Sequence, residues 1–282
     1  MLMNDHWLTY VRPLKPVPSG IDQRGEPIGK VACIVFDIYG TLLISGSGDI
    51  GIVKKADKNL DRLEELFQRY RIPHSPHQLL DAFFSAIKTE HSNLKRKGID
   101  YPEVNVIRIW ETVLDCRRPE NLHNFALEFE LIINPVYPMP HLSELLAACR
   151  RTDTQMGIVS NAQFYTPILI EYFLNSELVD LGFDPDLTVF SYQLGRAKPS
   201  SVLFEKVGTS LDKKHMPRSS SLYIGNDMLN DIKPAKRSGF QTALFAGDAR
   251  SLRLRTDDIR CQGLSADMVV TDLLQLVDFL ER

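Results

Sequence analysis

Hydrophobic and polar positions in the first part of the chain point to one strongly apolar strand. Residues 31–36 form a short run that is apolar throughout, and the run ends at Asp37. A run of this kind is typical of a strand buried on both faces. Gly40 and Thr41 follow closely, so we expect the strand to end in a tight turn.

The next segment has a helical pattern. From about residue 52 to 135, hydrophobic residues recur at helical spacing, most clearly over 60–67, 79–87 and 107–114. Prolines at and after position 135 mark the end of this block. We therefore predict a helical domain over residues 51–135, inserted after the first strand.

The rest of the chain alternates between strand and helix signals, which predicts βαβ units and a parallel sheet. The expected strands are 156–159, 187–190, 222–224, 242–245 and 268–270, and the expected helices are 142–150, 166–174, 201–208, 231–238 and a last one capped by Thr271 or Asp272. The predicted fold class is α/β, a three-layer, doubly wound parallel sheet with an inserted helical domain. Residues 31–50 and 136–282 form its core, and the proline- and glycine-rich residues 1–30 form an irregular N-terminal extension.

Composition and charge narrow the choice of partners. The formal net charge of −3 does not indicate the basic surface with which proteins bind nucleic acid, nor a polybasic patch that binds membranes. No apolar run approaches the ~20 residues that span a bilayer, and the first residues lack a signal-peptide core, so we expect a cytoplasmic protein. The four cysteines, Cys33, Cys116, Cys149 and Cys261, lie far apart and predict reduced, mostly buried thiols.

Polar residues that could carry chemistry follow several of the predicted strands. They are Asp37, Ser160, Asn161, Lys198, Asp227 and Asp231. Ligands of open α/β sheets bind outside the carboxyl ends of the strands, so we expect these side chains to meet at one edge. Each of them alone is typical of an ordinary turn, helix terminus or solvated surface; their coincidence at strand ends favours a site.

Four segments resemble the motifs of the haloacid dehalogenase superfamily of hydrolases, in the family's order. Residues 36–42 (FDIYGTL) resemble the first motif, 159–161 (VSN) the second, 198–199 (KP) the third and 225–231 (GNDMLND) the fourth. The helical insertion lies where members with a helical C1-type cap carry theirs. The resemblance implies a hydrolase that uses Asp37 as a nucleophile.

The chemistry of these residue types suits such a role. A carboxylate can attack phosphorus or carbon to form a covalent intermediate that water later hydrolyses. Phosphoryl transfer also needs charge neutralisation, which Mg²⁺ and Lys198 could supply, while Thr41, Ser160 and Asn161 offer hydrogen-bond donors to the transferring oxygens.

The expected Mg²⁺ ligands are oxygen atoms. Asp37 and Asp227 are the candidate carboxylates, and Asp231 lies one helical turn beyond Asp227 if that turn is helical. The resemblance adds the backbone carbonyl of Tyr39.

Two departures from the family pattern leave the reaction open. Most phosphatases of the superfamily have a second aspartate, the general acid and base, where this chain has Tyr39, and the sequence DxYGT is that of the 2-haloacid dehalogenases. Halide needs no protonation as it leaves, so carbon–halogen hydrolysis is an alternative. Asn226 occupies the position of the first aspartate in many fourth motifs, with Asp227 beside it.

The sequence therefore leaves three candidate functions. The first is Mg²⁺-dependent hydrolysis of a small phosphorylated metabolite through an aspartyl-phosphate, favoured because paired carboxylates repel without a cation. The others are dehalogenation and the binding of a phosphorylated ligand with little turnover. An inserted cap favours a small-molecule substrate. Residues 45–48 and 134–140 are the candidate hinges, and Tyr101, Glu103 and Trp110 are possible specificity residues. The substrate and the oligomeric state are left open.

Overall fold

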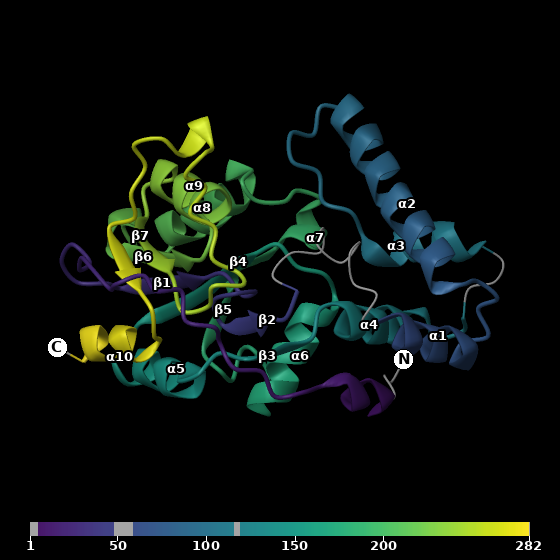
Figure 1. Ribbon diagram of the computed structural model, residues 1–282. Coiled ribbons are helices and arrows are strands. Elements are labelled where there is room, and N and C mark those ends of the chain that lie inside the picture. The colour runs from purple at the N-terminus through teal and green to yellow at the C-terminus, as the bar shows by residue number, and fades with distance from the viewer. Residues whose placement is uncertain (1–4, 48–58, 116–118, 282) are drawn as a thin grey trace.

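The computed structural model describes residues 5–47, 59–115 and 119–281, and a six-stranded parallel sheet lies at its centre (Figure 1). The strand order is β5-β4-β1-β6-β7-β8. The strands are β1 (Cys33–Phe36), β4 (Gln155–Ser160), β5 (Phe183–Phe190), β6 (Ser221–Gly225), β7 (Gln241–Phe245) and β8 (Met268–Val270). The α/β fold class and all the predicted strands are confirmed, although β5 begins four residues before the predicted strand.

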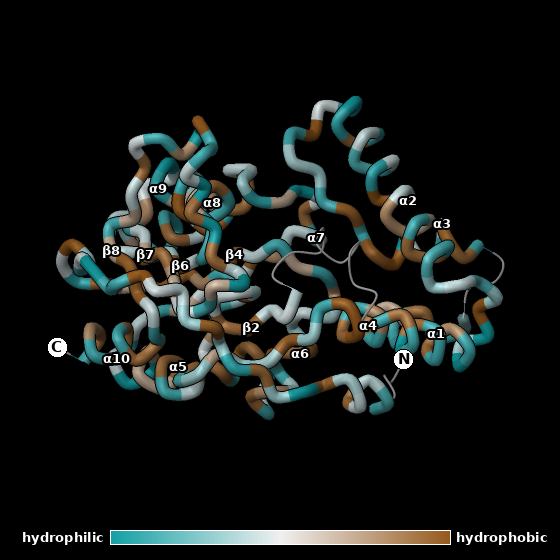
Figure 2. Tube along the Cα trace, viewed as in Figure 1, coloured by the Kyte–Doolittle hydropathy of each residue, from teal (hydrophilic) through white to brown (hydrophobic). Residues whose placement is uncertain are grey.

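Helices cover both faces of the sheet. On one face lie α5 (Leu142–Arg151), α6 (Tyr165–Leu174) and α10 (Leu274–Leu280), and on the other α8 (Ser201–Lys213) and α9 (Lys233–Arg237). Strand β1 shows why its sequence is apolar throughout: Ile34 and Phe36 pack in the first hydrophobic cluster, and Cys33 and Val35 in the second. Hydrophobic stretches accordingly run through the centre of the core in Figure 2. The short helix α7 (Ser191–Leu194) follows β5.

The inserted segment is helical, as predicted. It contains α1 (Leu60–Arg69), α2 (Pro76–Arg96), α3 (Val106–Leu114) and α4 (Leu122–Ile133), grouped to one side of the sheet (Figure 1). Aromatic packing joins them: the rings of Phe83 and Trp110 stack with centroids 4.2 Å apart. Helix α2 begins with a capping box between Ser75 and Gln78, which satisfies the free amides of its first turn.

Two short strands that the sequence pattern did not reveal connect the sheet to these helices. They are β2 (Leu43–Ser45) and β3 (Val136–Pro138), and they pair antiparallel. Both candidate hinges lie here: Ser45 and Ser47 donate hydrogen bonds from their hydroxyls to Asn134 Oδ1, at 2.8 and 2.9 Å. Gly48, the last residue of the first hinge, lies outside the described residues.

The predicted irregular N-terminal extension covers one edge of the sheet. Arg24 and Val269 of β8 exchange backbone hydrogen bonds of 3.1 and 2.7 Å. The outer edge of β8, which has no neighbouring strand in the sheet, is therefore paired with the extension at this residue. Short non-α turns complete the described elements: 3₁₀ turns at Asp5–Tyr10, Arg218–Ser220 and Ile259–Cys261, and a π-helical turn at Met228–Ile232. The helix expected over 231–238 is therefore divided between this π-helical turn and α9.

The described part of the chain contains no helix that is both long and apolar enough to cross a membrane. Cys33, Cys149 and Cys261 are buried free thiols, as expected, and burial raises the pKa of Cys33 and Cys149 to about 12. Cys116 lies outside the described residues.

Candidate active site

The candidate nucleophile lies at the carboxyl edge of the central strands. Asp37 directly follows β1, and its backbone amide still donates a hydrogen bond of 2.8 Å to Ile224 of β6. Because β4 and β6 flank β1, their ends bring Ser160 and Asn226 to the same edge. The expected convergence of polar residues at strand ends is therefore present.

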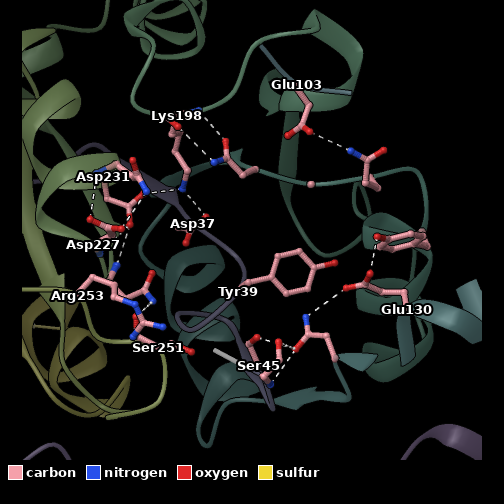
Figure 3. A pocket seen from close by; sticks show the side chains of 18 of the residues that line it. Asp37, Tyr39, Ser45, Glu103, Glu130, Lys198, Asp227, Asp231, Ser251 and Arg253 are labelled. Carbon is pink, nitrogen blue, oxygen red and sulfur yellow. Dashed lines mark hydrogen bonds and ion pairs between the residues drawn. The ribbon is translucent and has the colours of Figure 1, made fainter. Parts of the chain in front are cut away.

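A cavity of about 340 Å³ opens over Asp37 between the sheet and the cap helices (Figure 3). Most of the residues that line it are polar or charged. The lining residues are Asp37, Tyr39, Ser45, Ser47, Glu103, Glu130, Asn134, Asn161, Ala162, Gln163, Tyr165, Lys198, Asn226, Asp227, Asn230, Asp231, Ser251, Arg253 and Arg255. A polar cavity of this size fits a small, hydrophilic substrate.

Lys198 connects two carboxylates at the floor of this cavity. Its Nζ donates hydrogen bonds to Asp37 Oδ1 at 2.6 Å and to Asp231 Oδ1 at 2.5 Å, and all three side chains are buried. Burial alone lowers the pKa of a lysine, but the charges of Asp231 and Asp37 outweigh it and raise the pKa of Lys198. Lys198 is therefore a fixed positive charge beside the candidate nucleophile.

Asn161 holds the loop that carries Lys198. Its side-chain Oδ1 accepts a hydrogen bond of 2.7 Å from the backbone amide of Lys198, and its Nδ2 donates one of 3.5 Å to the carbonyl of the same residue. Asn161 thus links the end of β4 to the lysine. It also lines the cavity, while its side-chain hydrogen bonds go to the backbone of Lys198.

Both carboxylate oxygens of Asp231 accept hydrogen bonds. Besides Lys198, its Oδ1 accepts from the hydroxyl of Tyr223 at 2.9 Å, and its Oδ2 accepts from the backbone amides of Asn226 and Asp227. Burial raises the pKa of Asp231 to about 7, with neighbouring carboxylates adding to the effect and Lys198 opposing it. A side chain at Gly225 would collide with Asp231, so this tight packing requires glycine there.

Asp227 is held by an arginine that the sequence pattern did not single out. Its carboxylate accepts from Arg255 Nε at 3.1 Å and from Arg255 Nη2 at 2.6 Å, a two-point pair. Its Oδ1 also accepts the backbone amides of Leu229 and Asn230, which caps the turn that follows β6. Both oxygens of Asp227 are therefore occupied.

These contacts bear on the expected Mg²⁺ ligands. All carboxylate oxygens of Asp227 and Asp231 accept protein hydrogen bonds, and the described residues contain no group of three or more His, Cys, Asp or Glu side chains that could hold a metal ion. Direct binding of the ion by Asp227 and Asp231 therefore remains a prediction from the sequence.

A smaller set of oxygen donors fits the ion better. Within the described residues, Asp37 Oδ2 and Asn226 Oδ1 have no hydrogen-bond partner, because Asp37 is bonded through Oδ1 and Asn226 donates through Nδ2 to the carbonyl of Ser251 at 2.7 Å. One carboxylate and one amide oxygen, completed by a backbone carbonyl and water, suit the chemistry of Mg²⁺. Asn226 is the residue that can join Asp37 in such a site.

Tyr39 has no access to acid–base chemistry near neutral pH. Its hydroxyl hydrogen-bonds the Thr166 hydroxyl at 2.8 Å, and burial together with the charge of Glu130 raises its pKa far above the ordinary value. The turn after it depends on glycine: Gly40 has φ +83°, and a side chain there would collide with Asn226 and Ser251.

Other predicted residues lie outside the cavity. Thr41 and Ser160 are fully buried, and the Thr41 hydroxyl has no hydrogen-bond partner among the described residues. Trp110 packs in the cap core and Tyr101 does not line the cavity, whereas Glu103 does. The expected contacts of Thr41 and Ser160 with substrate therefore remain predictions that the cavity wall does not support.

Sequence reasoning missed several residues of the wall. Arg253 and Arg255 come from the loop after β7, and Glu130 and Asn134 from the end of α4. The only signal for the arginines was their place shortly after a predicted strand. Glu130 carried no signal, because its helical pattern resembles that of any solvent-facing glutamate.

Comparison with known proteins agrees with this architecture. No protein-family model matches the sequence, and comparison with curated protein sequences gives no significant match. Solved structures do match: a 2-haloacid dehalogenase from Pseudomonas syringae pv. Tomato has a TM-score of 0.52 and 17% identity, covering 89% of this chain and 99% of that one.

Two further similar structures belong to other members of the same superfamily. A phosphatase from Thermococcus onnurineus has a TM-score of 0.52 and 17% identity, covering 89% of this chain and 98% of that one. The putative hydrolase YfnB from Bacillus subtilis, bound to magnesium, has a TM-score of 0.50 and 14% identity, covering 90% and 100%. The chain therefore has the haloacid dehalogenase fold, with both its α/β core and its helical insertion.

Proposed function

We propose that this protein is a hydrolase of the haloacid dehalogenase superfamily in which Asp37 attacks the phosphorus of a small phosphorylated compound. The observation that carries the proposal is the ion pair between Lys198 Nζ and Asp37 Oδ1, at 2.6 Å, in the floor of a polar cavity. A buried cation beside the nucleophile stands where negative charge gathers during phosphoryl transfer.

The reaction needs two displacements at phosphorus. A carboxylate oxygen of Asp37 forms the new P–O bond while the bond to the leaving group breaks. Water then attacks the phosphorus of the aspartyl-phosphate, releasing inorganic phosphate and restoring the carboxylate. Lys198 stabilises the negative charge in both steps and stays in place through its contact with Asp231.

Mg²⁺ would be held by Asp37, the backbone carbonyl of Tyr39 and Asn226. When bound, the ion supplies charge neutralisation for the phosphoryl oxygens. Asp227 and Asp231 contribute to this proposal through the residues they hold, Arg255 and Lys198 respectively.

Tyr39 limits the range of leaving groups. No carboxylic acid stands two residues after Asp37 to protonate a departing alkoxide, and the pKa of Tyr39 is too high for that task. We therefore expect good turnover only for phosphates whose leaving group departs as a stable anion, such as aryl and acyl phosphates.

Dehalogenation is the second candidate, and Tyr39 is the specific observation that favours it. Attack of Asp37 on carbon would release halide, which needs no proton, and the superfamily's 2-haloacid dehalogenases share the tyrosine. Proteins described as dehalogenases are among the similar structures. The many polar and charged residues that line the cavity, Lys198 among them, argue for the phosphorylated substrate.

One experiment separates the two. Purified protein is assayed with p-nitrophenyl phosphate and acetyl phosphate, and separately with L-2-chloropropionate, each with Mg²⁺ and with chelator, beside the Asp37→Asn variant. Phosphate release that requires Asp37 and Mg²⁺ supports the proposal. Halide release that is indifferent to chelator supports the second candidate, and absence of both favours a ligand-binding role. From the sequence we also expect cytoplasmic location and no nucleic-acid or membrane partner.

A further inference from the structure

The cavity has two ends of different charge. Lys198, Asp227, Asp231 and Arg253 gather on one side of Asp37, and Glu103 and Glu130 lie on the other, as Figure 3 shows. On the first side each carboxylate has a cationic partner, with Lys198 between Asp37 and Asp231 and Arg255 on Asp227. The second side differs because its acidic groups have only neutral partners among the residues that the structure describes.

Glu130 projects from the last turn of α4 into this second side. Its Oε2 accepts a hydrogen bond of 2.9 Å from the Tyr165 hydroxyl, and its Oε1 accepts one of 3.3 Å from Asn134 Nδ2. No cationic side chain of the described residues pairs with Glu130. Burial raises the pKa of Glu130, which shows that its charge is poorly compensated.

Glu103 reaches the same side from the cap, in the loop between α2 and α3. It accepts hydrogen bonds from the Ser191 hydroxyl at 2.7 Å, from Gln163 Nε2 at 3.3 Å and from the backbone amide of Val104. These donors are also neutral, and burial raises the pKa of Glu103 as well. Its charge is likewise uncompensated by any described cation.

A short segment of chain connects the two glutamates. Gln163 bonds Glu103, and Tyr165, two residues later, bonds Glu130. Burial raises the pKa of Tyr165, and the charges of Glu130 and Glu103 add to the effect. Both carboxylates line the cavity that opens over Asp37.

We propose that Glu103 and Glu130 determine substrate specificity by binding a protonated amine on the leaving group of the phosphorylated substrate. This inference rests on the proposed function and names the substrate class within it. Lys198 and the neighbouring cations attract the phosphoryl end, and an ammonium group at the other end supplies the positive charge that the two glutamates lack. Since each carboxylate has lone pairs free beyond its neutral partners, an ammonium group in this part of the cavity can bond either of them and is attracted by the charge of both.

Three ligands of equal size test the proposal: O-phosphoethanolamine, 2-hydroxyethyl phosphate and phosphoglycolate, which end in an ammonium, a hydroxyl and a carboxylate. Their binding to the Asp37→Asn variant is measured by calorimetry, so turnover is not needed. We expect O-phosphoethanolamine to bind tightest, by on the order of 10-fold or more over the hydroxyl compound. Equal or tighter binding of either other ligand overturns the proposal.

Glu130→Gln and Glu103→Gln then locate the effect, each combined with Asp37→Asn. Both changes keep the size and hydrogen-bonding capacity of the side chain while removing its charge, so each is expected to reduce the preference for the amine several-fold and to leave binding of 2-hydroxyethyl phosphate nearly unchanged. Glu65→Gln, on the exposed face of α1, is the matched control. An unchanged preference in both glutamine variants contradicts the assignment.

The proposed function can fail separately from this inference. If p-nitrophenyl phosphate is not hydrolysed by the wild-type protein but the ammonium ligand still binds preferentially, the phosphatase proposal is wrong and the specificity assignment stands. If p-nitrophenyl phosphate is hydrolysed without any preference for the ammonium ligand, the phosphatase proposal stands and the assignment is wrong.

Discussion

The Nζ atom of Lys198 lies 2.6 Å from Oδ1 of Asp37, the candidate nucleophile. The same ammonium group lies 2.5 Å from Asp231, so one cation serves two buried carboxylates from different parts of the chain. The lysine reaches this point from the loop after β5, and Asn161 fixes its backbone. The shared positive charge offsets the repulsion between the carboxylates of Asp37 and Asp231 at this edge of the sheet.

Removal of this cation should therefore destabilise the fold as well as the site. In Lys198→Met, Asp37 and Asp231 lose their shared partner, and we expect the free energy of unfolding at pH 7 to fall by roughly 3–5 kcal/mol. Urea denaturation measures the change. Lys206→Met, at an exposed position on α8, serves as control and should cost well under 1 kcal/mol. Equal stability of the two variants would show that the carboxylates do not depend on Lys198.

Tyr39 predicts a strong dependence of rate on the leaving group. Because no acid protonates the departing oxygen, kcat/KM for p-nitrophenyl phosphate should exceed that for an alkyl phosphate such as glycerol 3-phosphate by on the order of 10²–10⁴. Tyr39→Phe should leave the rate with p-nitrophenyl phosphate within about three-fold, since the hydroxyl only bonds Thr166. A large loss of rate in Tyr39→Phe would mean that the hydroxyl takes part in the chemistry.

Asn226 predicts a gain of metal affinity by a single substitution. Asn226→Asp adds a carboxylate beside Asp37 where the structure offers only an amide oxygen, so the affinity for Mg²⁺ should rise by about ten-fold. Calorimetric titration with Mg²⁺ in the absence of substrate measures it. Asn230→Asp adds the same charge to the cavity wall and is the control. A similar gain in both variants would reduce the effect to general electrostatics and remove Asn226 as a ligand.

Glu130 predicts a pH dependence of stability with a definite sign. Its pKa is raised in the folded protein by burial, so the folded state retains a proton that the unfolded chain loses above its ordinary pKa. The contribution of this group to the free energy of unfolding is present below the ordinary pKa of a glutamate and is lost as pH rises toward the folded value. Compared with wild type, Glu130→Gln should show a smaller loss of stability between about pH 4 and 7. Parallel pH–stability curves for the two proteins would contradict the raised pKa.

The sheet was predictable because its strands are short apolar runs that end in glycine or polar residues. The fully buried run ending at Asp37 and the motif around Asp231 both carried that signal. By contrast, β2 and β3 have three residues each, too few to show the alternation of a strand. The π-helical turn before α9 is capped by Asp227, whose contact with Arg255 is visible only in the folded structure. Residues near each other in space but distant in sequence, such as Asp227 and Arg255, could not be paired from the chain alone.

The same limit applies to the candidate site. Asp37, Lys198 and Asp231 follow strands in a recognisable order, so their convergence could be predicted. Glu130 lies on a helix of the inserted segment, and its approach to the cavity depends on how that segment packs against the sheet. Whether Asn226 or Asp227 is the better candidate metal ligand likewise depends on the two hydrogen bonds from Arg255 to Asp227, which only the folded structure shows.

If the proposed function is correct, Asp37 becomes phosphorylated during turnover. A single turnover of acetyl phosphate with Mg²⁺ is stopped with acid at successive times, and borohydride then converts any acyl phosphate into an alcohol that mass spectrometry locates. We expect homoserine in place of Asp37 in the samples stopped at intermediate times, in an amount that approaches one per enzyme molecule. No homoserine is expected at positions 227 and 231. Release of one equivalent of phosphate with no modification at position 37 at any time would contradict the proposed function.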